Sequence, residues 1–256
     1  MAKIALGSWK EAADPEFPRS VFTELLLTFV FVFTGVSAAV SAEEMGGGQG
    51  TITGLTAAAA TNAMLVAVIV AVGMDASAGH LNPAVTIGFA AGGYVTVIRC
   101  ALYIVAQLLG SAAACFLLMY ISGGQDLPMH ALGSGMRPLQ GLVMELLLTF
   151  SMVFTIYAVV VEPKKGVVSS VAPLLVGLIV GANTLAGGYF SGASMNPARS
   201  FGPALARWNW TDHWIYWAGP LVGSALAGFV YDRLYVTRSS DDGAFLLPVD
   251  REEAFS

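Results

Sequence analysis

Charged residues are scarce in this chain: only 11% of its 256 residues are Asp, Glu, Lys or Arg, whereas 56% are hydrophobic. A soluble globular protein carries about 25% charged residues, so a protein built of soluble domains is excluded. Long stretches without Asp, Glu, Lys or Arg include 25–42, 45–74, 76–98, 100–125, 146–161 and 166–198. A transmembrane helix needs about 20 consecutive apolar residues. The sequence therefore predicts an all-α membrane protein with several spans.

Cysteine and histidine are also rare, with two and three residues respectively. Cys100 and Cys115 lie in apolar runs and are expected to be free, packed thiols. None of these side chains stands at the spacing of metal ligands, so we expect no metal and no cofactor. The net charge of −5 and the lack of a basic cluster exclude nucleic acid as a partner. No nucleophile–base pair is visible in a span, so we expect no catalytic residues and no enzyme.

The hydropathy pattern predicts six full spans and two short apolar segments near 80–92 and 194–206, each opened by a proline. An even number of spans puts both ends of the chain on the same side. That side then holds nine of the 12 Lys and Arg residues, which fits the positive-inside rule with both tails in the cytosol. The predicted spans are about 19–41, 54–74, 97–120, 138–160, 171–187 and 213–236.

The two halves of the chain repeat each other. Glu-Leu-Leu-Leu-Thr-Phe occurs at 24–29 and again at 145–150, and His-Leu-Asn-Pro-Ala at 80–84 is matched by Ser-Met-Asn-Pro-Ala at 194–198. Each half contains three spans and one short segment after its second span. Because three is odd, the second half is inverted in the membrane relative to the first. Inverted repeats meet near the midplane, where pores and substrate sites form.

Each Asn-Pro-Ala motif predicts the start of a short helix inside the membrane. Proline favours the first turn of a helix, and asparagine favours the capping position before it. Inverted symmetry aims both helix N-termini, each with about half a positive charge, at one point. There they would repel cations, while the asparagine amides donate hydrogen bonds to water. The motif residues are Asn82, Pro83, Ala84, Asn196, Pro197 and Ala198.

Four further polar residues accompany these motifs. Arg199 follows the second motif, and an arginine at this depth indicates a functional site; a snorkelling interfacial arginine is the alternative. Glu24 and Glu145 are matching intramembrane acids. Each is expected to accept backbone N–H bonds from the re-entrant loop beside it, and a proton relay is the alternative. His80 is expected to be a hydrogen-bonded structural group.

Together these motifs resemble the major intrinsic proteins, the aquaporin family, over about 19–236. Pro-Lys-Lys-Gly at 163–166, Gly-Leu-Ile-Val-Gly-Ala-Asn at 177–183 and Phe-Ser-Gly at 190–192 resemble plant tonoplast intrinsic proteins in particular. The resemblance implies a homotetramer with one pore per subunit in the vacuolar membrane. The expected fold has six transmembrane helices plus two re-entrant half-helices. The expected organisation is a cytosolic tail over 1–18, a channel domain over 19–236 with halves at about 19–120 and 138–236, and a cytosolic tail over 237–256.

The resemblance also implies which residues form the selectivity filter: Asn62, Thr184, Ala193 and Arg199, with His130 flanking the arginine. Tonoplast proteins usually carry His in place of Asn62 and Ile or Val in place of Thr184. Because three of the four walls are small here and two are polar, we expect a wide filter. An asparagine bonded to a neighbouring helix and a threonine bonded within its own helix are the alternative interpretations.

The predicted function is a passive channel for water and small neutral solutes that excludes ions and protons. Urea, ammonia and hydrogen peroxide are expected to pass, with glycerol more slowly. The alternative is a secondary transporter, which also uses inverted repeats and broken helices. A transporter should carry ion-coupling acids near the midplane beyond Glu24 and Glu145, and the sequence has none there. The expected partners are these solutes, the lipid bilayer and further copies of the chain.

Overall fold

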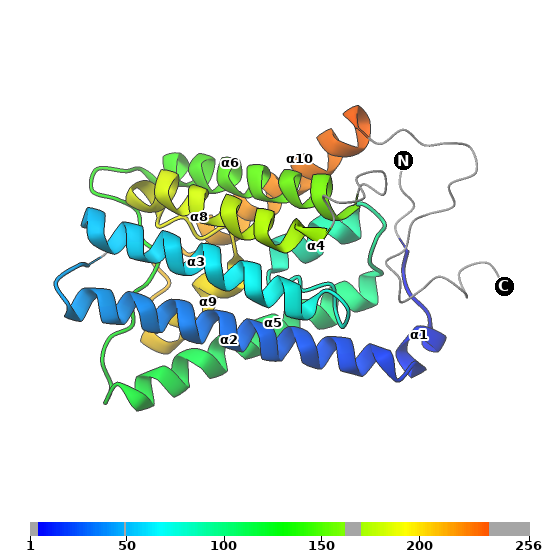
Figure 1. Ribbon diagram of the computed structural model, residues 1–256, viewed down its shortest axis with the longest axis horizontal. Helices are drawn as coiled ribbons and strands as arrows, with labels where there is room; N and C mark the ends of the chain where they lie inside the picture. The colour runs from blue at the N-terminus through cyan, green and yellow to red at the C-terminus, as the bar shows by residue number, and fades with distance from the viewer. Residues whose placement is uncertain (1–4, 49, 162–169, 236–256) are drawn as a thin grey trace.

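A computed structural model describes residues 5–48, 50–161 and 170–235, which form helices joined by loops (Figure 1). A short helix, α1 (Trp9–Ala13), precedes the bundle. Two half-helices, α4 (Pro83–Ala91) and α9 (Pro197–Arg207), lie within it. The long helices are α2 (Glu16–Glu44), α3 (Ile52–Gly73), α5 (Val97–Ile121), α6 (Pro138–Ile156), α8 (Ala172–Ser191) and α10 (Ile215–Leu234), and α6 continues as a π-helical turn, η1 (Tyr157–Val161).

The long helices match the six predicted spans to within a few residues. In the described part of the chain, α2, α3, α5, α6 with η1, and α8 are long and apolar enough to cross a membrane. The sixth, α10, is 20 residues long but is not among them, because its glycines, proline and aromatic residues lower its mean hydropathy. Its packing shows that it belongs with the others: α10 lies against α6 as α5 lies against α2. The predicted all-α fold is confirmed.

The two halves interlock through their half-helices. The first half-helix, α4, packs against α10 of the second half, and α9 packs against α5 of the first. Ser224 on α10 donates a hydrogen bond to the carbonyl of Ala84 at 2.6 Å, and Ser111 on α5 donates to that of Ala198 at 2.5 Å. In each bond, the acceptor is the backbone carbonyl of the alanine of an Asn-Pro-Ala motif. The half-helices cannot shift without breaking these contacts.

Glycines permit the close approach of the paired long helices. A Cβ atom at Gly110 of α5 would lie 2.3 Å from the carbonyl oxygen of Leu25, and one at Gly223 of α10 would lie 2.3 Å from that of Leu146. Leu25 and Leu146 hold the same place in the repeated Glu-Leu-Leu-Leu-Thr-Phe motif. Both halves thus use the same packing device, as expected of small residues between membrane helices.

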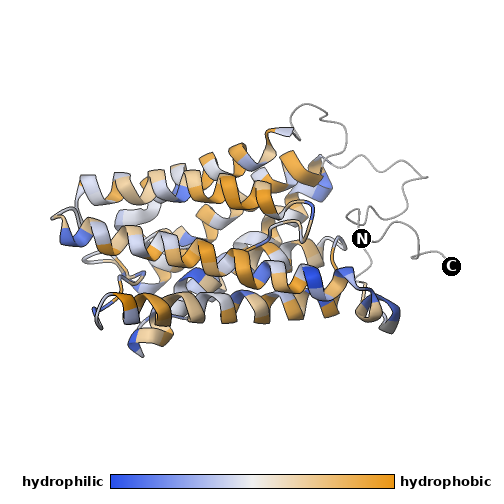
Figure 2. Cartoon of the chain, turned by 60° about the horizontal axis from the view of Figure 1, so that its bottom comes forward, coloured by the Kyte–Doolittle hydropathy of each residue, from blue (hydrophilic) through white to orange (hydrophobic). Residues whose placement is uncertain are grey.

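The outer surface of the bundle is apolar, as a lipid environment requires. Along α2, Phe22 is 62% exposed, Leu26 46% and Val30 38%, and the other long helices expose leucine, valine and phenylalanine in the same way. Figure 2 shows hydrophobic residues along the lengths of the helices. Because large apolar side chains face outwards here while glutamate is buried, the bundle is suited to a membrane and not to water.

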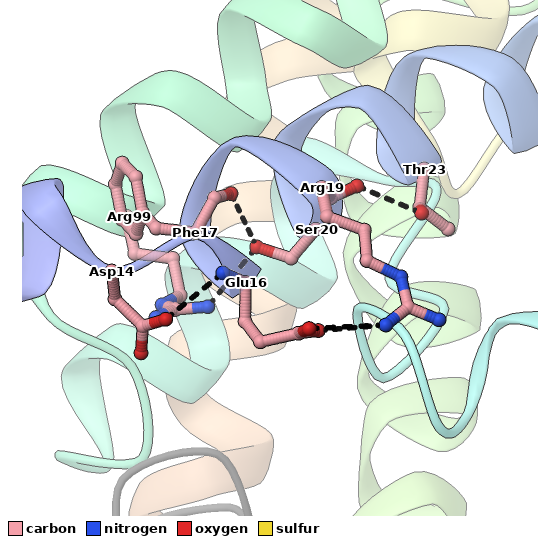
Figure 3. A network of polar contacts seen from close by, with 7 residues as sticks. All are labelled: Asp14, Glu16, Phe17, Arg19, Ser20, Thr23 and Arg99. Atoms are coloured by element: carbon pink, nitrogen blue, oxygen red, sulfur yellow. Dashed lines mark hydrogen bonds and ion pairs between the residues drawn. The ribbon is translucent and has the colours of Figure 1, made fainter.

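The N-terminal segment is fastened to one end of the bundle, which we call the N-terminal face. Arg99 at the start of α5 forms an ion pair with Glu11 of α1 at 3.0 Å and donates to the hydroxyl of Ser20 at 3.1 Å. Its guanidinium also lies 4.9 Å from the ring centre of Phe17 (Figure 3). These contacts orient the start of α2, which carries Glu24 two turns further on.

Candidate pore

Both Asn-Pro-Ala motifs begin a half-helix, and each asparagine is the N-cap. The side-chain oxygen of Asn82 accepts from the N–H of Ala84 at 2.8 Å, and that of Asn196 accepts from Ala198 at 2.9 Å. Proline occupies the first turn in both helices. The local sequence thus explains why a helix starts at this depth.

The two asparagines also join the halves to each other. The amide of Asn82 donates to the carbonyl of Met195 at 2.8 Å, and the amide of Asn196 donates to the carbonyl of Leu81 at 3.0 Å. Leu81 and Met195 have positive φ angles of 56° and 54°, which non-glycine residues rarely adopt. An asparagine amide carries two N–H groups. One N–H of each side chain is therefore left for a molecule between the two helix N-termini.

Each re-entrant loop is held from behind by a buried glutamate. Glu24 accepts the backbone N–H groups of His80 and Leu81, both at 2.8 Å, and the hydroxyl of Ser77 at 2.7 Å. Gln107 donates to the same carboxylate at 2.8 Å. The backbone N–H groups of His80 and Leu81 are thereby paired, as the membrane interior requires.

Glu145 repeats this arrangement in the second half. It accepts the backbone N–H groups of Ser194 and Met195 at 2.9 and 2.7 Å, and the hydroxyl of Ser191 at 2.6 Å. Ser77 and Ser191 were not among the sequence-predicted residues. Their signal was available, because each stands five positions before its asparagine in the repeat.

A directional hydrogen-bond chain ends on each motif asparagine. The Thr86 hydroxyl donates to the carbonyl of Asn82 at 3.0 Å, so its oxygen is free to accept from Nδ1–H of His80, 3.1 Å away. Gln107 donates to the same oxygen at 2.9 Å. His80 is thus a buried structural group within the first half.

In the second half, the equivalent series of hydrogen bonds includes an imidazole from a loop that is distant in the sequence. The Ser194 hydroxyl donates to the carbonyl of Asn196 at 2.9 Å, so the Ser200 hydroxyl must donate to Ser194, 2.5 Å away. His130 Nδ1, 2.9 Å from Ser200, is then the donor to its oxygen. This order assigns the proton of His130 to Nδ1 and leaves Nε2 as an acceptor.

The predicted filter residues lie one helical turn beyond a cavity. The cavity, on the N-terminal side of the asparagine pair, is lined by Phe31, Val66 and Val180 and by the motif asparagines. Its volume is about 60 Å³, room for about four waters in file. The next turn of α3 carries Asn62, and the next turn of α8 carries Thr184.

Asn62 and Thr184 are hydrogen-bonded to each other. The amide of Asn62 donates to the hydroxyl oxygen of Thr184 at 3.2 Å, and that hydroxyl donates to the carbonyl of Val180 at 2.9 Å. Both side chains are buried. The two alternative interpretations of these residues thus describe real bonds, and the Thr184 proton is already used within its own helix.

Arg199 and Ala193 are also brought together at this level. The guanidinium of Arg199 donates to the carbonyl of Ala193 at 3.3 Å, and Ala193 has a positive φ of 50°. His130 lies beside them, on the loop that precedes α6. Burial and the nearby charges of Arg199 and His213 hold the pKa of His130 well below 6.5. The imidazole is therefore neutral at neutral pH.

A wide hollow opens beyond His130 on the face opposite α1. It has a volume of about 500 Å³ and is lined by His130 together with Glu43, Asp126, Arg207 and Asp212. The order along the molecule is thus a narrow apolar cavity, the asparagine pair, the predicted filter residues and an open vestibule. In the described ranges, no group of three His, Cys, Asp or Glu residues could hold a metal ion.

An inverted repeat of six crossing helices, with two half-helices that meet between two cavities, defines a membrane channel. Comparisons with known proteins agree. The family model "Major intrinsic protein" matches residues 11–231. The chain therefore belongs to the major intrinsic proteins, and it is a passive channel for water and small solutes and not an enzyme.

Relatives narrow the subfamily. The chain is 54% identical to aquaporin TIP4-4 of Zea mays, over 94% of this chain and 96% of that protein. It is 52% identical to aquaporin TIP4-1 of Arabidopsis thaliana, over 93% of this chain and 94% of that protein. It is 47% identical to aquaporin TIP2-1 of the same plant, over 93% of this chain and 96% of that protein. The predicted tonoplast intrinsic subfamily is confirmed. The relatives also support the predicted multi-pass protein of the vacuolar membrane.

A solved structure supports the fold. The aquaglyceroporin from Plasmodium falciparum is 23% identical in sequence and superposes with a TM-score of 0.75, covering 85% of this chain and 96% of that chain. At this identity the likeness shows the fold alone.

Proposed function

We propose that this pore conducts water in single file and also passes urea, ammonia and hydrogen peroxide, with glycerol slower, while it excludes ions and protons. The observation that carries the proposal is the asparagine pair. Each amide donates one N–H to a carbonyl of the opposite half, that of Met195 or Leu81. Its second N–H is left to donate to a molecule in the lumen. A water that accepts from both amides turns its own hydrogens away from the pair, which interrupts a proton-conducting chain of waters.

Cation exclusion has a second support in the charges at the filter. The two helix N-termini each carry about half a positive charge, and Arg199 adds a full one within the same half of the pore. The buried carboxylates of the repeat, Glu24 and Glu145, are already bonded to the backbone of the loops. A cation in the filter would therefore lose its hydration without gaining a negative partner.

The site roles in this proposal are as follows. Asn82 and Asn196, with the prolines and alanines of their motifs, form the midplane barrier. Asn62, Thr184, Ala193 and Arg199 form the filter, and His130 flanks it. Glu24, Glu145 and His80 hold the loops in place. The pore domain is 19–236, with halves at about 19–120 and 138–236 and with tails at 1–18 and 237–256.

We also propose that four copies assemble in the bilayer, each with its own pore. The support is the outward apolar surface of the long helices together with a complete pore within one chain. Chemical cross-linking of the purified protein in a mild detergent tests the assembly. A ladder that ends at four subunits supports it, and a monomer at all cross-linker concentrations contradicts it.

The flux law tests the channel itself. Purified protein is reconstituted into liposomes, and urea entry is followed by light scattering at increasing urea concentration. A pore gives a rate that rises linearly and ignores imposed sodium and proton gradients, whereas a carrier saturates and responds to one of them. Saturation at or below about 1 mM, the upper end of the usual range for specific sites, or a response to either gradient, would contradict the proposal.

A further inference from the structure

One glycine on the inner face of α2 is not explained by packing. Gly35 follows Glu24, Thr28 and Phe31 at steps of four, three and four residues, which keep to one face of a helix. Those three side chains are buried, whereas Gly35 is partly exposed. Since the inner face has no contact with lipid, this exposed surface at Gly35 borders space inside the protein.

Other inward glycines show what a packing role looks like. A Cβ at Gly110 or Gly223 would lie 2.3 Å from a backbone carbonyl, so any side chain there would push two helices apart. A Cβ at Gly35 would meet only Oδ1 of Asn62, at 3.9 Å, which is an ordinary contact. Glycine is a poor residue for a helix interior, and neither close approach nor a positive φ requires it at this position.

The repeat gives an independent comparison. Gly35 stands eleven residues after Glu24, and Ile156 stands eleven residues after Glu145. Ile156 lines the narrow cavity on the N-terminal side, as do Phe31 and its counterpart Met152. The position eleven residues after the repeated glutamate therefore carries a bulky side chain in the second half and none in the first. In the first half this position, Gly35, lies at the level of Asn62 in the proposed filter.

Asn62 presents a free acceptor to this space. Thr184 donates its own proton to Val180, so the Asn62 atom that faces it must be the amide nitrogen, and Oδ1 points the other way. No described residue donates to Oδ1, and it is not among the buried atoms that lack a partner. It therefore has access to the open space beside Gly35.

We propose that Gly35 and Asn62 form a binding recess for the N–H group of a small neutral carboxamide solute such as urea. The inference rests on the proposed function, because it places the recess beside the filter. Asn62 Oδ1 accepts one N–H of the solute, and the solute carbonyl faces the guanidinium of Arg199 across the pore. The missing side chain at Gly35 supplies the width that a planar solute needs and a water does not.

The test measures urea and water permeability of liposomes that contain wild-type protein, Gly35→Ala, Gly35→Val or the control Thr34→Val. Thr34 is exposed on the outer face of the same helix. We expect Gly35→Val to lower the urea-to-water ratio by about tenfold, the most that loss of one neutral hydrogen bond gives. Gly35→Ala should lower the ratio less, and Thr34→Val should leave it unchanged. Alanine favours the helix, so at least this variant will fold.

A second pair of variants tests the acceptor. Asn62→Leu keeps the branched shape of the side chain and removes Oδ1, and should lower the urea-to-water ratio as Gly35→Val does. Thr184→Val removes the partner of Asn62 but not Oδ1, and should lower the ratio less. The proposed recess is contradicted if Gly35→Val and Asn62→Leu both keep the wild-type urea-to-water ratio, or if wild type passes water but no urea. Either result leaves the assignment as a water channel intact. If wild type passes neither, the proposed function itself fails.

Discussion

The two re-entrant loops have the same frame but differ in what supports their asparagine. In the first, the imidazole of His80 comes from the motif itself, and Gln107 bonds both Thr86 and Glu24. In the second, the imidazole comes from His130 on a separate loop. The first loop is therefore closed by groups within the bundle, whereas the second is completed by a segment at the mouth of the pore.

The difference continues into the neighbouring helix. Ser111 and Ser224 bond the two half-helices in the same manner, and the residue one turn before each is Gln107 in α5 and Pro220 in α10. Proline has no side-chain donor, so Glu145 receives one hydrogen bond fewer than Glu24. On the proposed site roles, the first loop is chiefly an anchor, whereas the second, with Arg199 and Ala193, also contributes to the filter.

Removal of the glutamates should have the largest effect and should rank the two loops. Glu24→Ala leaves two backbone N–H groups and two side-chain donors without their acceptor. Glu145→Ala leaves two backbone N–H groups and one side-chain donor without theirs. Because hydrogen bonds to a charged acceptor contribute about 1.5–3 kcal/mol each, both variants should be destabilised by more than about 3 kcal/mol, Glu24→Ala the more. Thermal unfolding in detergent measures this. Equal or reversed melting temperatures would contradict the ranking.

Replacement of either motif asparagine by aspartate should abolish most water flux. A carboxylate can still cap the half-helix, but it cannot donate to Met195 or Leu81, so two acceptors would face each other. Desolvated acceptors without a donor cost about 1–3 kcal/mol, and the new charge would bind cations in the lumen. Osmotic shrinkage of liposomes checks both variants, after gel filtration has verified their assembly. Wild-type permeability with intact ion exclusion would rule this role out.

The double substitution Asn62→Phe, Thr184→His should separate the two loops by function, since both residues lie beside the second. The larger side chains narrow the filter at two of its four walls, and the substitution of Asn62 also removes its side-chain carbonyl. We expect urea flux to fall by about tenfold or more and water flux by about threefold or less; tenfold corresponds to about 1.4 kcal/mol. Parallel urea and water measurements in liposomes test this, and equal losses of both fluxes would contradict it.

The smallest effect is expected from His130. Burial, followed by the charges of Arg199 and His213, lowers the pKa of His130 well below 6.5. The imidazole therefore stays neutral in mild acid, and the population of its charged form rises only as the pH falls further. Water and urea flux should therefore stay constant from neutral pH to about 6.5 and decline at lower pH by about two- to threefold, roughly 0.5 kcal/mol. His130→Ala should show no decline. The same acid response in both proteins would remove His130 from the filter.

Much of this architecture could be predicted from the sequence because its signals are local. Uncharged runs predict spans, and Asn-Pro predicts a helix start. An exact six-residue repeat, together with three spans in each half, predicts inversion. Hydropathy alone is a weaker guide to α10, whose place follows from its packing on α6. The boundaries of α4 and α9 follow directly from the capping chemistry of Asn82 and Asn196.

The contacts within the site could not be predicted in the same way, because they join residues far apart in the chain. Nothing in the sequence near Asn62 indicates that its amide is bonded to Thr184, or that the Thr184 proton belongs to Val180. We therefore expect fewer free polar groups at the filter than the residue types suggest. Gln107 and Gly35 lie outside the repeated motifs, and their proposed roles rest largely on their three-dimensional neighbours.

The most direct measurement is simultaneous recording of water and proton movement in one liposome preparation. Vesicles with the protein and an internal pH-sensitive dye are exposed to an osmotic step and a pH step together. The asparagine pair, the two helix N-termini and Arg199 predict shrinkage that accelerates with protein content while the pH gradient decays no faster than in empty vesicles. A proton leak that rises in proportion to the water flux would contradict the account.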